Sequence, residues 1–331
     1  MSQAMFDVVG VGNAIVDVLG QADEEFLRRN ALEKGAMTLV DAKRIDELYG
    51  AMGPAVEMSG GSAANTLAGV ASLGGRGAYI GKVANDQFGR IFIHDLRAIG
   101  VDYRSRPVGG VTAPTARCLV FVTPDAQRTM QTFLGISVEL GPDDIDPEAI
   151  GGARITYLEG YLFDREPAKE AFVKAAEIAH AAGRKVALTL SDPFCVDRHR
   201  AAFLHLVQGH VDIVFANEAE ICSLYQVAGF DAAAAAIRGH CEIAALTRSE
   251  HGSVVIAGEA THAVGAEPVA QVVDTTGAGD LYAAGFLFGL TQGRDLPTCA
   301  RIGSVAAAEV IRHFGARPET SLAELLKQKL P

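Results

Sequence analysis

Tryptophan is absent from this chain of 331 residues, and cysteine is sparse. The cysteines are odd in number, lie far apart and form no Cys-x-x-Cys pair: Cys118, Cys195, Cys222, Cys241 and Cys299. This pattern indicates neither a disulfide framework nor a zinc site, and it fits a reducing compartment. Residues 1–7 resemble no signal peptide, and no apolar run reaches the ~18 residues of a membrane span. We therefore expect a cytoplasmic protein.

Positive charge is also in short supply, with 29 lysines and arginines against 40 aspartates and glutamates and a net charge of −11. This balance argues against binding to nucleic acid or to an acidic membrane. The chain also lacks the Gly-x-x-x-x-Gly-Lys-[Ser/Thr] phosphate loop and the protein-kinase signatures. Gly10 and Gly12 suggest a dinucleotide fingerprint, but Ile15 occupies its third glycine position. The length allows one large domain or two.

The stretch 274–280 reads Asp-Thr-Thr-Gly-Ala-Gly-Asp and leads into an uncharged run, 281–291, that predicts a buried helix. Gly277, Ala278 and Gly279 would let backbone N–H groups converge at the helix N-terminus, where the helix dipole also favours an anion. Asp280 stands at the rim of this expected anion pocket, and we interpret it as a general base for a substrate hydroxyl. The alternative is an ordinary helix cap.

A second informative stretch contains Gly60, Gly61, Ser62 and Asn65. Ser62 is a good N-cap for a helix that we expect to run to residue 73, and Asn65 lies one turn further on the same face. Small residues here allow a ligand to approach closely, or they form a hinge. Tight helix packing is the alternative, but it explains the alanines better than the polar pair.

Polar residues also follow two expected strands. Asn13 and Asp17 come after the run 6–11, and ligands bind at the carboxyl ends of strands in open α/β sheets. Asp17 could accept hydrogen bonds from a polyol, or it is a turn residue. Asn217 and Glu220 follow the run 213–216 and are spaced to hold the waters of a magnesium ion. A capping box is the alternative, and both interpretations can hold together.

From residue 153 onward, apolar strands alternate with helical segments, which predicts a mostly parallel sheet with helices on both faces. Residues 117–122 and 128–133 form a hairpin pattern. The extended regions 14–40 and 105–135 interrupt the alternation, so we predict that they form a small β-sheet lid. The core would then comprise 1–13, 41–104 and 136–331. Arg128 could reach a phosphate from this lid, although a solvated arginine is the simpler interpretation.

Taken together, these motifs resemble the ribokinase (PfkB) family of small-molecule kinases over nearly the full length. The N-terminal signature matches residues 60–65 and 81–89, the C-terminal signature matches 274–280, and Asn217-x-x-Glu220 matches a third motif. Within the family, the chain looks most like bacterial adenosine kinases and sugar kinases. The resemblance implies a ribokinase-like α/β fold.

The resemblance also implies a role for each matching residue. Asp280 would deprotonate the acceptor, while Gly277, Ala278 and Gly279 bind the transferring phosphoryl group. The residues expected at the substrate are Asn13, Asp17, Met37, Gly60, Gly61, Ser62, Asn65, Arg128 and Tyr161. Those expected at ATP are Asn217, Thr247, Gly252, Thr276, Gly279 and Ser304, where serine replaces the asparagine or histidine of many members. Asn217 and Glu220 would place Mg²⁺ through water, and Asp274 and Thr276 a potassium ion.

These implications lead to one functional hypothesis with two alternatives. We expect an ATP-dependent kinase that phosphorylates the 5′-hydroxyl of a nucleoside, with adenosine giving AMP in purine salvage. Tyr161 and the apolar run 37–40 favour a purine. One alternative is a kinase for a free sugar such as ribose or fructose, and the other is a non-catalytic nucleoside-binding protein. The sequence is compatible with a monomer or a homodimer.

Overall fold

The computed structural model describes residues 4–110, 113–125 and 127–330. Within these residues, nine strands form one large sheet in the order β14-β13-β12-β11-β10-β9-β1-β5-β6. All neighbours are parallel except at one edge, where β13 runs antiparallel to both β12 and β14. The strands are β1 (Phe6–Val11), β5 (Gly77–Ile80), β6 (Val101–Tyr103), β9 (Ala153–Glu159), β10 (Lys185–Thr189), β11 (Ile213–Asn217), β12 (Ile243–Thr247), β13 (Ser253–Ala257) and β14 (Ala260–Val264). The predicted mostly parallel sheet is therefore confirmed.

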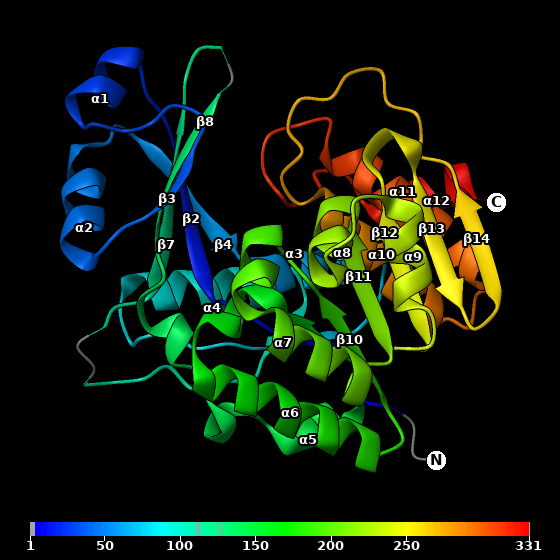
Figure 1. The fold of residues 1–331 in the computed structure, drawn as a ribbon. Coiled ribbons are helices and arrows are strands. Elements are labelled where there is room, and N and C mark those ends of the chain that lie inside the picture. The colour runs from blue at the N-terminus through cyan, green and yellow to red at the C-terminus, as the bar shows by residue number, and fades with distance from the viewer. Residues whose placement is uncertain (1–3, 111–112, 126, 331) are drawn as a thin grey trace.

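Helices cover both faces of this sheet (Figure 1). Successive strand residues face opposite sides, so Val8 and Val9 enter different hydrophobic clusters. The cluster around Val9 packs against α5 (Pro147–Gly152), α6 (Glu166–Ala181), α7 (Pro193–Gly209), α8 (Glu218–Tyr225) and α9 (Phe230–Ile237). The cluster around Val8 packs against α3 (Ser62–Ser72), α4 (Gln87–Ala98), α10 (Ala278–Thr291) and α11 (Leu296–Val310). The last helix, α12 (Leu322–Lys329), packs against α11 and α3. The sequence does not predict the helices α7 and α11 or the strand β14.

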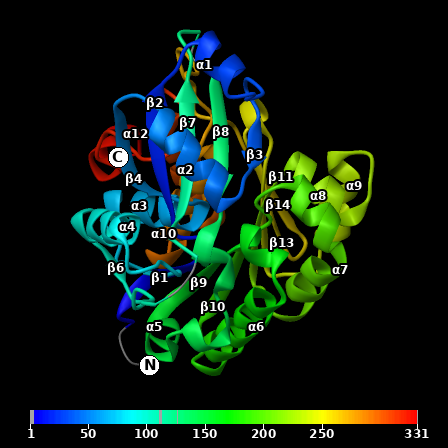
Figure 2. The ribbon, with the colours of Figure 1, turned by 90° about the vertical axis from the view of Figure 1, so that its left-hand side faces the viewer.

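A second, five-stranded sheet has the order β3-β8-β7-β2-β4. Its strands are β2 (Ile15–Gln21), β3 (Met37–Leu39), β4 (Ala55–Gly60), β7 (Ala116–Val122) and β8 (Arg128–Phe133). The predicted hairpin is confirmed, because β7 and β8 pair antiparallel. Helices α1 (Glu24–Arg29) and α2 (Ala42–Ala51) cover the side of this small sheet that faces away from the core (Figure 2). The other side faces the large sheet.

The structure corrects one boundary of the predicted lid. Residues 41–60 were assigned to the core, but β4 pairs with β2 in the small sheet. Helix α2 likewise contacts β7 and β8 of the small sheet. Strand pairing is set by contacts between distant parts of the chain, and the local sequence of 55–60 does not name its partner. No helix in the described residues is long and apolar enough to cross a membrane.

Candidate active site

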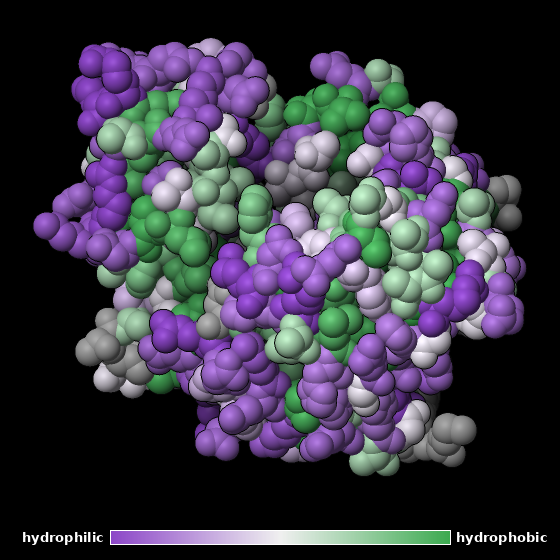
Figure 3. Space-filling model, in the orientation of Figure 1, coloured by the Kyte–Doolittle hydropathy of each residue, from purple (hydrophilic) through white to green (hydrophobic). Residues whose placement is uncertain are grey.

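A cavity of about 790 Å³ lies between the small sheet and the carboxyl ends of the large sheet's central strands. It is visible as the hollow between the two parts of the molecule in Figure 3. Asn13, Glu159, Thr189, Asn217 and Thr247 line it directly after or at the ends of β1 and of β9 to β12. This is the edge at which open α/β sheets bind ligands. The cavity therefore has one wall from each sheet.

The anion turn, defined as residues 275–279, forms part of the cavity wall and includes the start of helix α10. Gly277 is the N-cap residue and adopts the left-handed conformation, with φ of 78°. A Cβ on Gly277 would lie 2.7 Å from Cβ of Ala316, so glycine is needed there for two separate reasons. At Gly279, by contrast, a Cβ would meet no atom within 4 Å.

Free backbone donors face the cavity at this turn. The N–H of Ala278 donates to the Thr275 carbonyl, and that of Leu281 donates to Gly277. Between them, the N–H groups of Gly279 and Asp280 have no backbone acceptor within the described residues. Unpaired donors at a helix N-terminus, with open space in front of them, suit a phosphate group.

Asp280 lies at the junction of the two sequence motifs. Its Oδ1 accepts a hydrogen bond of 2.6 Å from the Ser62 hydroxyl, and its Oδ2 accepts one of 3.0 Å from Nδ2 of Asn65. Burial raises the pKa of the Asp280 carboxyl, while these two hydrogen bonds and the Arg317 guanidinium lower it. The carboxylate is thus oriented by helix α3 and faces the same cavity as the anion turn.

Asp17 extends from β2 of the small sheet into the cavity. Burial raises the pKa of its carboxyl to about 6, against the opposing effects of Arg317 and Arg128. A Cβ on Gly60 would lie 2.3 Å from Oδ2 of Asp17, so the glycine makes room for the carboxylate. Gly60 does not line the cavity itself.

Gly61 provides the second close approach. It has φ of 93°, and a Cβ at this position would lie 2.3 Å from the Asn13 carbonyl oxygen. The close approach observed at Gly61 is between two segments of the protein, and the predicted approach of a ligand at this Gly-Gly pair stays a prediction. It brings Asn13, Ser62 and Asn65 to one wall of the cavity. Gly61, rather than Ser62, occupies the N-cap position of α3.

Glu159 is buried beside Asn13 and was not anticipated from the sequence. Its Oε1 accepts from the backbone N–H and from Nδ2 of Asn13, at 3.3 and 3.0 Å, and its Oε2 accepts from the Ala63 N–H at 2.9 Å. Burial raises the pKa of Glu159 to about 7, although these hydrogen bonds oppose the effect. A glutamate at the end of a strand carries no local signal of this role, because its partners come from two distant segments.

Asn217 and Glu220 form the reciprocal capping box of helix α8. The Asn217 side chain accepts from the Glu220 N–H at 2.8 Å, and Glu220 Oε2 accepts from the Asn217 N–H at 2.9 Å. Burial raises the pKa of Glu220 to about 7, and the charges of Asp192 and Asp280 add to the effect. A cation near these carboxylates would relieve that repulsion. The described residues contain no group of three or more His, Cys, Asp or Glu side chains that could hold a metal ion. The water-mediated magnesium site at Asn217 and Glu220 stays a prediction.

Arg128 reaches the core from strand β8. Its Nη1 forms an ion pair with Asp274 and donates a hydrogen bond of 2.7 Å to the Thr276 hydroxyl. Asp274 also accepts from Thr276 and from the Gly315 N–H. Both carboxylate oxygens of Asp274 are therefore occupied in this conformation, and a potassium ion there would compete with Arg128. The potassium site stays a prediction.

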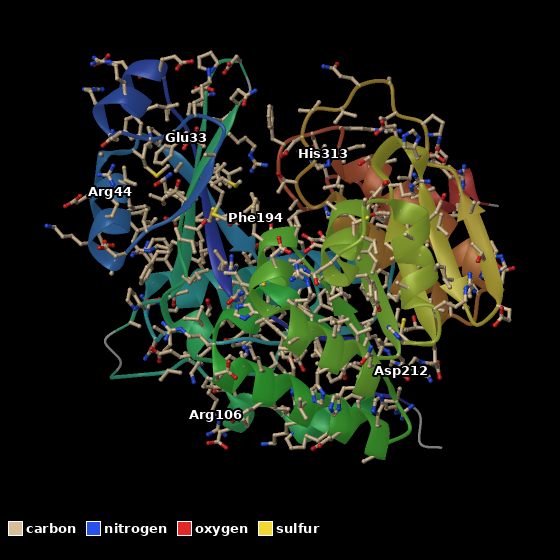
Figure 4. All side chains as sticks on the ribbon, in the orientation of Figure 1. Glu33, Arg44, Arg106, Phe194, Asp212 and His313 are labelled. Carbon is tan, nitrogen blue, oxygen red and sulfur yellow. The ribbon has the colours of Figure 1, made fainter. Side chains whose placement is uncertain are left out.

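Apolar side chains line the outer part of the cavity. Met37 and Leu39 come from β3, and Tyr161 and Phe194 come from the core. Phe194 is 72% exposed at the amino end of α7, on the side facing the small sheet (Figure 4). An exposed phenylalanine at the rim of a cavity offers its ring to a ligand, and a flat apolar group can pack against it.

Most of the predicted site residues come together in this cavity. Those that line it are Asn13, Asp17, Met37, Gly61, Ser62, Asn65, Arg128, Tyr161, Asn217, Glu220, Thr247, Thr276, Gly277, Ala278, Gly279 and Asp280. Gly252 and Ser304 do not: Gly252 makes a tight turn against Val264, and the Ser304 hydroxyl accepts from the Glu267 N–H at 2.7 Å. Their expected contacts with ATP stay predictions.

Comparisons with known proteins agree on the family. The model of the pfkB family of carbohydrate kinases matches residues 38–322. The crystal structure of adenosine kinase from Sinorhizobium meliloti is 54% identical, with a TM-score of 0.90 over 98% of this chain and 100% of that chain. A probable sugar kinase from Rhizobium etli CFN 42 is 52% identical, with a TM-score of 0.91 over 99% of both chains.

Among curated proteins, similarity extends to more than one substrate class. Adenosine kinase from Saccharomyces cerevisiae is 27% identical over 93% of this chain and 95% of its own length. A 5-dehydro-2-deoxygluconokinase from Shouchella clausii is 28% identical over 80% of this chain and 84% of its own length. The reaction class is therefore better determined than the acceptor.

Proposed function

The chain belongs to the pfkB family of carbohydrate kinases, a family of phosphotransferases with an alcohol acceptor, and we propose that its acceptor is the 5′-hydroxyl of a nucleoside, first of all adenosine. The observation that carries this proposal is the division of the cavity into a polar floor and an apolar rim. Asp17, Asn65 and Asp280 line the cavity and are buried or half-buried, so we call them its floor, while the lining residues Tyr161 and Phe194 are exposed and form its rim. A nucleoside has the matching division into sugar and base.

The polar floor would hold the ribose. Carboxylate groups accept hydrogen bonds from sugar hydroxyls and amide groups both donate and accept them, and Asp17 and Asn65 reach the floor from strand β2 and from helix α3. The base would then lie toward Phe194, Tyr161, Met37 and Leu39, where an aromatic face can stack on it. A free sugar would leave this apolar rim uncovered.

Asp280 would take the proton of the acceptor hydroxyl. The Ser62 hydroxyl and the Asn65 amide hold its two oxygens, which fixes the carboxylate and favours its charged form. As that proton leaves, the acceptor oxygen attacks the γ-phosphorus of ATP, the bond from this phosphorus to the β–γ bridging oxygen breaks, and ADP departs with the bonding electron pair. The N–H groups of Gly279 and Asp280 are free to stabilise charge on the phosphoryl oxygens. Positioning and charge stabilisation supply most of the rate in such transfers.

Asn217 and Glu220 are the residues that would hold magnesium, through water. When bound, the ion neutralises charge on the ATP phosphates. The raised pKa of Glu220, caused by burial and by neighbouring carboxylates, is consistent with a place where a cation is favourable. The capping box fixes both side chains at the junction of β11 and α8, where they would bind the waters of the ion.

A sugar kinase is the second candidate. The similarity to the probable sugar kinase and to the 5-dehydro-2-deoxygluconokinase supports it, as does the polar floor, which would accept a free sugar equally well. A non-catalytic nucleoside-binding protein would not need Asp280, Ser62 and Asn65 in one hydrogen-bonded group.

An acceptor panel tests the proposal. ATP consumption should be measured with adenosine, guanosine, inosine, ribose, fructose and 5-dehydro-2-deoxygluconate. We expect the highest kcat/KM with adenosine. 5′-Deoxyadenosine is the matched control, because it has the base and ribose but no acceptor hydroxyl; it should inhibit competitively without turnover. Preferred turnover of any free sugar would replace the proposal with the second candidate, and turnover of none would refute both.

A further inference from the structure

Arg317 lies outside every motif found in the sequence, in the segment between α11 and α12. Its Nη1 donates a hydrogen bond of 3.0 Å to the Ala64 carbonyl, and its Nη2 donates to the Ser59 carbonyl at 2.7 Å and the Ser59 hydroxyl at 2.9 Å. Ser59 and Ala64 bracket Gly60, Gly61 and Ser62. The guanidinium therefore holds both ends of this stretch, which we call the acceptor turn (residues 59–64).

Asp95 of α4 holds Ser59 from another direction. Its Oδ2 accepts from the Ser59 N–H at 2.7 Å and from the Ser59 hydroxyl at 2.6 Å. The Ser59 hydroxyl thus donates to Asp95 and accepts from Arg317. Because strand β4 of the small sheet ends in the acceptor turn and α3 begins in it, this network connects the two parts of the protein at the cavity floor.

Arg317 also adds positive charge to a region rich in acidic groups. Its guanidinium lowers the pKa of both Asp17 and Asp280, whose carboxyls face the cavity. The titratable and charged groups whose pKa values are linked to the charge of Asp280 come from five different segments: Asp17, Tyr157, Glu159, Tyr161, Glu220 and Arg317. Arg317 is the only one of these groups whose charge lowers the pKa of Asp280, and it acts together with the hydrogen bonds from Ser62 and Asn65.

The neighbouring segment also contacts the anion turn and the aspartate that precedes it. The Gly315 N–H donates to Asp274 at 3.0 Å, and Ala316 fills the space beside Gly277. Residues 315–317 therefore support the anion turn on one side and the acceptor turn on the other. None of residues 315–317 lines the cavity, so they can affect the cavity only through the residues that they contact.

We propose that Arg317 is a positioning residue for phosphoryl transfer, which holds in place the acceptor turn and with it the Ser62 hydroxyl that donates to Asp280. This inference rests on the function proposed above, since it needs Asp280 as the proton acceptor. Loss of the guanidinium removes hydrogen bonds and charge together. The lysine variant keeps the charge but cannot reproduce the three hydrogen bonds of the planar guanidinium.

The experiment compares R317M, R317K and S59A with wild type and with R104M. Arg104 is a suitable control because it pairs with Asp102, Asp146 and Glu148 outside the cavity. The readouts are the pH profile of kcat/KM for the acceptor, the KM values of acceptor and ATP, and hydrogen exchange of the acceptor turn. Wild type is first assayed on the acceptor panel.

For R317M, we expect the acid limb of kcat/KM to move to higher pH, so that activity at pH 6 falls about tenfold more than activity at pH 8.5. The acceptor KM should rise, the ATP KM should stay, and the acceptor turn should exchange faster. In R317K and in S59A, the acid limb of the kcat/KM profile should stay at its wild-type pH, while the KM for the acceptor should rise. In R104M, both the acid limb and the acceptor KM should equal those of wild type.

Two failures are distinguishable. If wild type phosphorylates no acceptor, the proposed function fails, and the hydrogen-exchange comparison still decides whether Arg317 holds the acceptor turn. If wild type is active but R317M has the wild-type acid limb and acceptor KM, the inference about Arg317 is wrong. An R317M protein that loses only thermal stability, with R317K fully restoring it, would show a purely structural role and also refute the inference.

Discussion

The hydroxyl of Ser62 donates a hydrogen bond of 2.6 Å to Oδ1 of Asp280, which lies 218 positions later in the chain. This contact joins the acceptor turn at the start of α3 to the first turn of α10. Neither helix alone would orient the carboxylate, because one supplies the acid and the other supplies its hydrogen-bond donors. The active-site geometry therefore depends on the packing of α3 against α10.

The variant S62A tests this contact. Removing a donor to the charged form should raise the pKa of Asp280, since hydrogen bonds to a carboxylate lower its pKa. Activity that needs the deprotonated acid then appears at higher pH. We expect kcat/KM at pH 6 to fall about tenfold, with a smaller loss at pH 8.5. S72A, at the other end of α3, is the control, and equal pH profiles for all three proteins would contradict the assignment.

The two glycines of the anion turn should respond differently to alanine. G277A places a Cβ against Ala316 at a residue with positive φ, so it should lower the free energy of unfolding by about 1–3 kcal/mol. G279A meets no neighbouring atom and should fold normally. Its methyl group would stand in the space proposed for the phosphoryl group, so kcat should fall at least about tenfold. Urea unfolding and steady-state kinetics separate the two effects; wild-type kcat in G279A would argue against a phosphate there.

Phe194 offers a test of the proposed base contact. F194A should raise the KM for adenosine by about tenfold, because stacking on an aromatic ring is worth roughly 1–3 kcal/mol per base. Stability should change little, since the side chain is 72% exposed. F314A is the control: Phe314 is 43% exposed and does not line the cavity. An unchanged adenosine KM in F194A would place the base elsewhere.

Glu159 makes stability depend on pH. Its folded pKa of about 7 lies above the usual 4.5, so the folded state binds more protons than the unfolded state between these values. Its contribution to stability is therefore present below pH 4.5 and is lost as pH rises toward 7, by an amount on the order of 3 kcal/mol. In E159Q the destabilisation relative to wild type should become smaller from pH 5 to pH 8. The exposed E148Q is the control, and a constant difference for E159Q would refute the assignment.

The sequence predicted those parts of the site whose chemistry is local. The anion turn, the capping box of Asn217 and Glu220, and the hairpin each depend on residues a few positions apart, and all three appear in the structure. Glycines that are needed for a positive φ or for close approach of two backbone segments can also be recognised in the sequence. Family resemblance then assigned roles to residues whose local sequence says little, such as Asp17.

Residues whose function depends on distant partners were not predictable in this way. Glu159 acts on Asn13, 146 positions away, and Arg317 acts on Ser59, 258 positions away. Their sequence surroundings are an ordinary strand end and an ordinary loop. Strand β4 was placed in the wrong part of the protein for the same reason, because its partner β2 is found only through the sheet itself. Helix α7 is not predicted from the sequence, and in the structure its backbone is non-helical at His199.

The most direct test of the whole account is the turnover of D280N, with adenosine as the acceptor or whichever acceptor the panel identifies. The variant keeps the shape of the side chain but cannot accept the proton. We predict that kcat falls by about 10²–10⁴ while ATP affinity and the melting temperature are maintained. A D280N protein that phosphorylates its acceptor at the wild-type rate would contradict the central claim that Asp280 is the general base.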